Sequence, residues 1–147
     1  MFDVIVAATD GSQTARIAVQ QAVDLAAATG ARLEIVSAYE PVPVSRLRTE
    51  VQQAPPDVQW TIGPREDVEA LLEEAAGLAA DAGVAAGTHA RQGDPADAIL
   101  DVAEETHAGL IIVGNKGMTG ARRFLLGSVP NKISHHAPCS VLIIRTS

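Results

Sequence analysis

Hydrophobic residues along the chain form two alternating kinds of segment. Five short runs are predicted as strands: the first is almost continuously apolar, which is typical of a strand buried on both faces of a sheet, and the third is the weakest. Between them lie longer segments in which apolar residues recur every three or four positions, as in amphipathic helices. The strands are predicted at residues 2–8, 32–39, 84–91, 109–113 and 140–145.

Residues with known end preferences mark several helix boundaries. Ser12 follows the first strand and can cap a helix N-terminus, and Gly30 is suited to the end of that helix. Asp94 precedes a proline and predicts a second N-cap. A further helix opens at about residue 64 and ends before Gly83, and the last is expected from Ser128 to about residue 136. Prolines between residues 40 and 63 disfavour long regular elements there.

The alternation of strands and helices predicts how the chain is arranged in space. Strands joined by helices make right-handed crossovers in a parallel sheet whose two faces are covered. In open sheets of this kind, ligands bind beyond the carboxyl ends of the strands, where the strand order reverses. If the first and fourth strands are neighbours, Asp10 and the loop that begins at Gly114 face one another across one crevice.

That loop contains the most informative motif of the chain. Gly114 and Gly117 are followed after nine residues by Gly127 and Ser128. A strand that opens into a glycine-rich loop and returns into a helix presents backbone N–H groups, a hydroxyl and a helix N-terminus to one point. This arrangement suits a phosphate group.

Composition and charge narrow the class of protein. The 147 residues correspond to about one domain, so residues 1–147 are predicted to form a single unit. Hydrophobic residues make up 47% and aromatic residues 3%, which predicts a core of Ala, Val, Ile and Leu. The net charge of -7 argues against binding to nucleic acid or to anionic membranes.

Other features of the sequence predict a cytoplasmic protein. The chain has no apolar run long enough to span a membrane, and its first residues do not resemble a signal peptide. A lone cysteine, Cys139, agrees with a reducing compartment. The four histidines and this cysteine have no recognised ligand spacing, so no metal site is predicted.

The glycine motif and the strand end at residues 7–12 (Ala-Ala-Thr-Asp-Gly-Ser) closely resemble the universal stress protein family, specifically its nucleotide-binding branch with a G-2x-G-9x-G-S pattern. Gly-Asp-Pro at residues 93–95 and the C-terminal residues 137–144 extend the resemblance over essentially the whole chain. The resemblance implies an open, Rossmann-like α/β fold with five parallel strands in the order 3-2-1-4-5.

The resemblance also implies a ligand and a set of contacts. The ligand would be ATP or another adenine nucleotide, such as AMP or cyclic AMP, with any magnesium arriving through the phosphates. Asp10 would accept a hydrogen bond from a ribose hydroxyl. The adenine would contact main-chain groups near Ala8, Thr9 and Ala38 and the apolar side chains of Val113 and Val129. Ribose and phosphate would lie among Gly114, Asn115, Lys116, Gly117, Arg122, Gly127 and Ser128.

Several of these residues also have a simpler interpretation. Asp10 can be an ordinary turn residue, because Asp-Gly-Ser is a common turn sequence. Lys116 and Arg122 can equally be solvated loop charges. Ser128 is expected to cap the last helix, whether or not it also touches a phosphate.

The sequence supplies binding groups but no evident catalytic residues. It has no carboxylate pair placed to activate water, and the loop lacks the Gly-Lys-Ser/Thr ending of P-loop hydrolases. The leading hypothesis is therefore a stress-response sensor or reservoir of adenine nucleotide with at most weak ATPase activity. The alternatives are a slow nucleotide hydrolase and an interaction module with a vestigial pocket.

One residue departs from the family pattern. Pro130 stands where members of the family commonly have Ser or Thr, which removes one hydroxyl and one backbone N–H from the start of the last helix. The hypothesis that follows is a preference for AMP or cyclic AMP over ATP.

The last strand indicates a partner. Its apolar residues Val141, Leu142, Ile143 and Ile144 are expected at a sheet edge, where unpaired backbone groups favour association. A homodimer formed through this edge is predicted, as the resemblance also implies.

Overall fold

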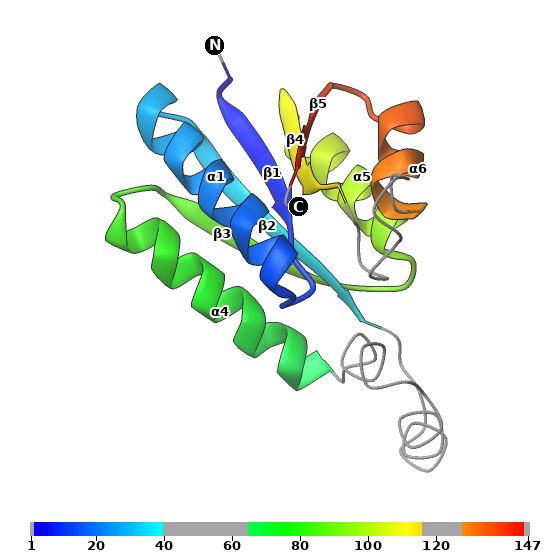
Figure 1. Ribbon diagram of the computed structural model, residues 1–147, viewed down its shortest axis with the longest axis horizontal. Coiled ribbons are helices and arrows are strands. Elements are labelled where there is room, and N and C mark those ends of the chain that lie inside the picture. The colour runs from blue at the N-terminus through cyan, green and yellow to red at the C-terminus, as the bar shows by residue number, and fades with distance from the viewer. Residues whose placement is uncertain (1, 40–64, 116–127, 146–147) are drawn as a thin grey trace.

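The computed structural model describes residues 2–39, 65–115 and 128–145. These residues form a five-stranded parallel sheet with strand order β3-β2-β1-β4-β5 and helices on both faces (Figure 1). The strands are β1 (Val4–Ala8), β2 (Arg32–Tyr39), β3 (Ala86–Gln92), β4 (Leu110–Gly114) and β5 (Ser140–Ile144). The helices are α1 (Gln13–Thr29), α4 (Arg65–Asp81), α5 (Pro95–Glu105) and α6 (Ser128–His136). The predicted fold class and strand order are confirmed.

The core consists of two apolar layers, one on each face of the sheet. Successive side chains of a strand point to opposite faces. Ile5 and Ala7 of β1 accordingly pack with α1 and α4, whereas Val6 and Ala8 pack with α5 and α6. Figure 1 shows the two pairs of helices on opposite sides of the sheet. Because β1 is buried on both faces, its sequence is apolar throughout.

The helix ends form as the sequence predicts. The Ser12 side chain accepts a hydrogen bond from the Ala15 N–H at 3.2 Å, and Gly30 ends α1 in the left-handed conformation with φ 73°. Asp94 caps α5 by accepting from the Asp97 N–H at 3.0 Å. Within the described ranges, none of the helices combines the length and apolarity needed to cross a bilayer.

The third strand begins later than predicted. The prediction places it at residues 84–91, whereas β3 spans Ala86–Gln92. Val84 is instead part of the turn that ends α4, because its N–H donates to the Ala79 carbonyl at 2.9 Å. The predicted irregular segment at residues 40–63 lies outside the described residues.

A buried carboxylate on β2 links this strand to its neighbour β3 at the edge of the sheet. Glu34 of β2 is only 6% exposed. Its Oε1 accepts a hydrogen bond from Arg32 Nε at 2.7 Å, and its Oε2 is hydrogen-bonded to His89 Nε2 at 2.8 Å. Gly87 lies against this carboxylate, and a Cβ there would collide with Oε2. Burial alone raises the pKa of Glu34, but the hydrogen bonds from Arg32 and His89 outweigh it and lower the pKa below its ordinary value of 4.5.

The Glu34 network predicts a pH-dependent contribution to stability. Because the folded-state pKa is lowered, the contribution is present above pH 4.5 and is lost as pH falls through the folded-state pKa. We expect Glu34→Gln to reduce the free energy of unfolding at pH 7 by about 1–3 kcal/mol. Urea denaturation at pH 7 and at several values below 4.5 checks this. If the difference in free energy of unfolding between the wild type and Glu34→Gln does not shrink in acid, the assignment is wrong.

Candidate functional site

The end of β1 leads into a tightly hydrogen-bonded turn. Thr9 is 4% exposed; its N–H donates to the Val36 carbonyl at 3.0 Å and its Oγ1 accepts from the Gly11 N–H at 3.1 Å. Asp10 is half-buried, and its Oδ1 accepts from the Ser12 N–H at 2.8 Å. Asp10 therefore has a structural role in this turn and is held at the carboxyl end of β1.

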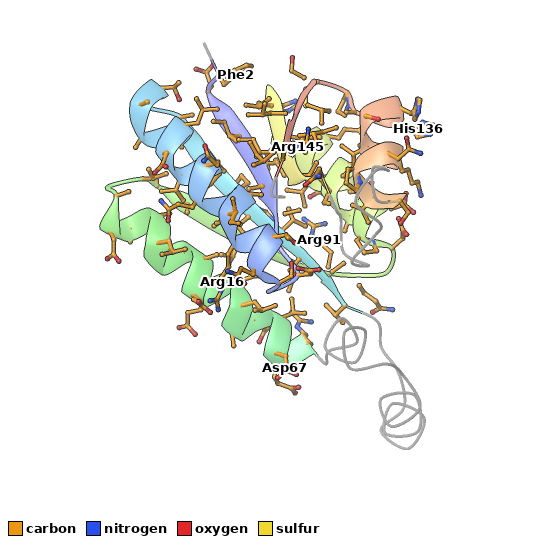
Figure 2. All side chains as sticks on the ribbon, in the orientation of Figure 1. Phe2, Arg16, Asp67, Arg91, His136 and Arg145 are labelled. Carbon is orange, nitrogen blue, oxygen red and sulfur yellow. The ribbon has the colours of Figure 1, made fainter. Side chains whose placement is uncertain are left out.

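Gly11 makes this turn possible through its backbone and its size. Its φ of +83° lies in the left-handed region, and an added Cβ would come within 2.5 Å of Leu71 Cδ2 on α4. Arg16 of α1 extends toward α4, where its Nη2 lies 2.9 Å from Glu74 Oε1 (Figure 2). Close packing of α4 against the start of α1 thus fixes the position of the turn.

The end of β4 lies beside the end of β1. The two strands pair in parallel, with Ile5 opposite Leu110 and Ala7 opposite Ile112. Val113 is buried and Gly114 is half-buried at this end. The Asn115 N–H donates to the Ile144 carbonyl of β5 at 2.9 Å, so this N–H is already used within the sheet. Lys116, Gly117, Arg122 and Gly127 lie outside the described residues.

The start of α6 completes the arrangement. Ser128 is exposed, whereas Val129 and Pro130 are buried. Lys132 Nζ lies 2.8 Å from Asp97 Oδ1 and 3.4 Å from Asp94 Oδ2, which ties α6 to the start of α5. Hydrogen bonds to these two carboxylates raise the pKa of Lys132.

These elements enclose a small cavity where the ends of β1 and β4 meet the starts of α1 and α6. Its volume is about 20 Å³, which is large enough for one water molecule. Among the described residues that line the cavity, four belong to the predicted site and three do not. The predicted residues are Ala8, Val113, Gly114 and Val129, and the others are Thr14, Ala15 and Pro130.

Besides Pro130, the described lining residues outside the predicted site are Thr14 and Ala15. Both lie in the first turn of α1, which begins where β1 ends. The signal that could have found them is topological, since the first turn after a strand at the switch point faces the same crevice as the strand end. Asp10, Thr9, Ala38 and Ser128 do not line the cavity. Ala38 packs on the same apolar layer as Ala8.

The cavity lies in a region of favourable potential for an anion. The N-terminal turns of α1 and α6 both border it, and neither first turn contains an acidic residue. A helix N-terminus carries partial positive charge and stabilises a nearby anion by about 0.3–1 kcal/mol near the surface. The arrangement can therefore hold a negatively charged group at its mouth.

A larger groove lies elsewhere, along β3 and residues 65–76 of α4, and has a volume of about 630 Å³. Most of its charged side chains are engaged within the protein: Arg65 pairs with Glu69, Arg91 with Glu105 and His89 with Glu34. It also runs alongside an outer strand and not across the point where the strand order reverses. We therefore assign the candidate site to the smaller cavity.

Comparison with known proteins identifies the family. The family model for universal stress proteins matches residues 1–145. The chain belongs to the universal stress protein family. Among relatives of this universal stress protein, YxiE of Bacillus subtilis (strain 168) is 36% identical over 148 residues, which cover 99% of this chain and 100% of YxiE.

Solved structures agree with the family and the fold. A universal stress protein crystallised in complex with cAMP is 32% identical, with a TM-score of 0.74 and coverage of 99% of this chain and 98% of that one. The universal stress protein from Archaeoglobus fulgidus in complex with dAMP has a TM-score of 0.66, with coverage of 98% of both chains. At 20% identity, that second likeness shows the fold alone.

The packing of the Asp10 turn predicts opposite effects for two glycine substitutions. Gly11→Ala introduces strain at positive φ and a collision with Leu71, so we expect the free energy of unfolding to fall by about 1–3 kcal/mol. Gly77 lies on α4, and a Cβ there would meet nothing within 4 Å. Gly77→Ala should instead raise stability by about 0.5–1 kcal/mol. Chemical denaturation measures both, and equal effects of the two would show that the turn is not under this constraint.

Proposed function

We propose that this universal stress protein binds an adenine nucleotide where the ends of β1 and β4 meet, and acts as a sensor or reservoir rather than as a fast catalyst. The observation that carries the proposal is the convergence of Ala8, Val113, Gly114 and Val129 on one cavity between two helix N-termini. The 32% identical universal stress protein in complex with cAMP supports the class of ligand.

The sugar and base would bind along the ends of the first two strands. Asp10 uses Oδ1 in its own turn, which leaves Oδ2 to accept from a ribose hydroxyl. The adenine would lie near the main chain of Ala8, Thr9 and Ala38, with apolar contact to Val113 and Val129. These side chains are buried or half-buried, so a base placed there would lose contact with water.

The phosphate would lie at the mouth of the cavity, which is too small to enclose it. Gly114 and Ser128 are its nearest described neighbours in the proposal, and Lys116, Gly117, Arg122 and Gly127 remain predicted contacts. The backbone N–H of Asn115 is engaged with Ile144, so this N–H is not one of the proposed phosphate donors. Any magnesium would accompany the phosphates of a longer nucleotide.

Pro130 favours a ligand with one phosphate. It is buried in the first turn of α6 and lines the cavity, yet it has no N–H to donate. The first turn of a helix ordinarily offers several unpaired N–H groups, and this one offers one fewer. We therefore propose that AMP or cyclic AMP binds at least as tightly as ATP.

Titration of nucleotide-free protein tests this function. Calorimetry with ATP, ADP, AMP and cyclic AMP should show binding, with the single-phosphate ligands at least as tight as ATP. Asp10→Asn keeps an oxygen to accept from the Ser12 N–H but removes the charge, and we expect roughly tenfold or greater loss of affinity. An unchanged melting temperature of Asp10→Asn is the control for folding. Lack of binding by every nucleotide refutes the function, and much tighter binding of ATP refutes the preference.

We also propose a homodimer through β5. Among the described strands β5 pairs only with β4, and Leu142 on it is 39% exposed. The unpaired backbone N–H and C=O groups of an unprotected edge can form hydrogen bonds with a second copy that pairs antiparallel to it.

Light scattering at micromolar concentration tests the dimer. The wild-type chain should have twice the mass of one copy, and Leu142→Lys should shift the equilibrium toward monomer by placing a charge at the edge. Ile17→Lys, at another exposed apolar residue on α1, is the matched control and should leave the mass unchanged. A wild-type monomer contradicts the proposal.

A further inference from the structure

We infer that the Thr14 hydroxyl donates a hydrogen bond to a phosphoryl oxygen of the bound nucleotide, so that α1 and α6 hold the phosphate from two sides. The inference rests on the proposed nucleotide-binding function. It assigns a ligand contact to a residue outside the glycine loop, on the helix that follows β1.

Thr14 is placed to reach a group at the mouth of the cavity. It is the second residue of α1, is half-buried and lines the cavity together with Gly114 and Pro130. Gly114 ends β4 and Pro130 lies in the first turn of α6. Thr14 therefore shares the cavity wall with the end of β4 and the first turn of α6.

A chain of hydrogen bonds connects the Ala15 N–H and the Ser12 hydroxyl to the Thr14 hydroxyl. The Ala15 N–H donates to Ser12 Oγ at 3.2 Å, and Ser12 Oγ lies 3.1 Å from Thr14 Oγ1. Either hydroxyl can be the donor in the second bond. If Ser12 donates, the Thr14 proton is released for another acceptor, and an anion in the cavity favours this direction because it needs a donor. Successive hydrogen bonds of this kind polarise and strengthen one another.

The charges and donors around the cavity agree with this role. The first turn of α1 contains no acidic residue, so no carboxylate of that turn competes for the Thr14 proton. The facing turn of α6 lacks an N–H at Pro130. The Thr14 hydroxyl on α1 therefore adds one hydrogen-bond donor to the site, whereas Pro130 on α6 leaves the site without one.

A comparison of ligands with and without a phosphate tests the inference. Thr14→Val keeps the branched shape and removes the hydroxyl. We expect its affinity for AMP to fall by roughly tenfold while its affinity for adenosine is unchanged. Thr14→Ser restores the hydroxyl and should restore AMP binding. Calorimetry on nucleotide-free protein gives both affinities.

Thr29→Val is the matched control. It removes a hydroxyl from the other end of α1, where Thr29 Oγ1 donates to the Leu25 carbonyl at 2.8 Å, and should change neither affinity. If wild-type protein binds AMP and Thr14→Val binds it equally well, or loses adenosine affinity to the same extent, the inference is wrong and the proposed function stands. If the wild-type protein binds neither AMP nor adenosine, the proposed function and the inference both fail.

Discussion

The parallel pairing of β1 with β4 is the constraint on which the site depends. These strands come from opposite halves of the chain, and their pairing places Ala8 and Val113 at the same edge of the sheet. Each strand leads toward a helix whose first turn borders that edge. Two positively polarised helix ends and two strand ends therefore meet at one cavity, and none of the described residues that line it is charged.

The small side chains of the core are what allow this close approach. Ala8 and Ala15 line the cavity, and Gly11 permits α4 to pack against the turn through Leu71. Polar groups near the site are mostly engaged: Thr9 and Asp10 accept backbone hydrogen bonds, and the Asn115 N–H is part of the sheet. The described residues around the site are thus held in shape by their own hydrogen bonds.

Much of this architecture could be predicted from the sequence because it follows from local patterns. Buried parallel strands read as apolar runs, and capping residues such as Ser12 and Asp94 mark helix starts through hydrogen bonds with their own neighbours. The bounds of β2 and α6 agree with the prediction.

The details that the pattern did not reveal depend on contacts between distant segments. Val84 has an apolar side chain suited to a strand, but its N–H completes the turn after α4. Glu34 interrupts a buried strand and is tolerated because Arg32 and His89 satisfy its carboxylate. Thr14 enters the candidate site because the first turns of α1 and α6, on opposite faces of the sheet, border the same cavity, which no local pattern specifies.

A crystal structure of the protein grown with AMP tests the central claim most directly, because it locates the nucleotide relative to both strand ends. The account predicts the ribose hydroxyls within hydrogen-bonding distance of Asp10 and the phosphate between Gly114 and the first turns of α1 and α6. Electron density for AMP in the groove beside β3, with Asp10 contacting only its own turn, would contradict it.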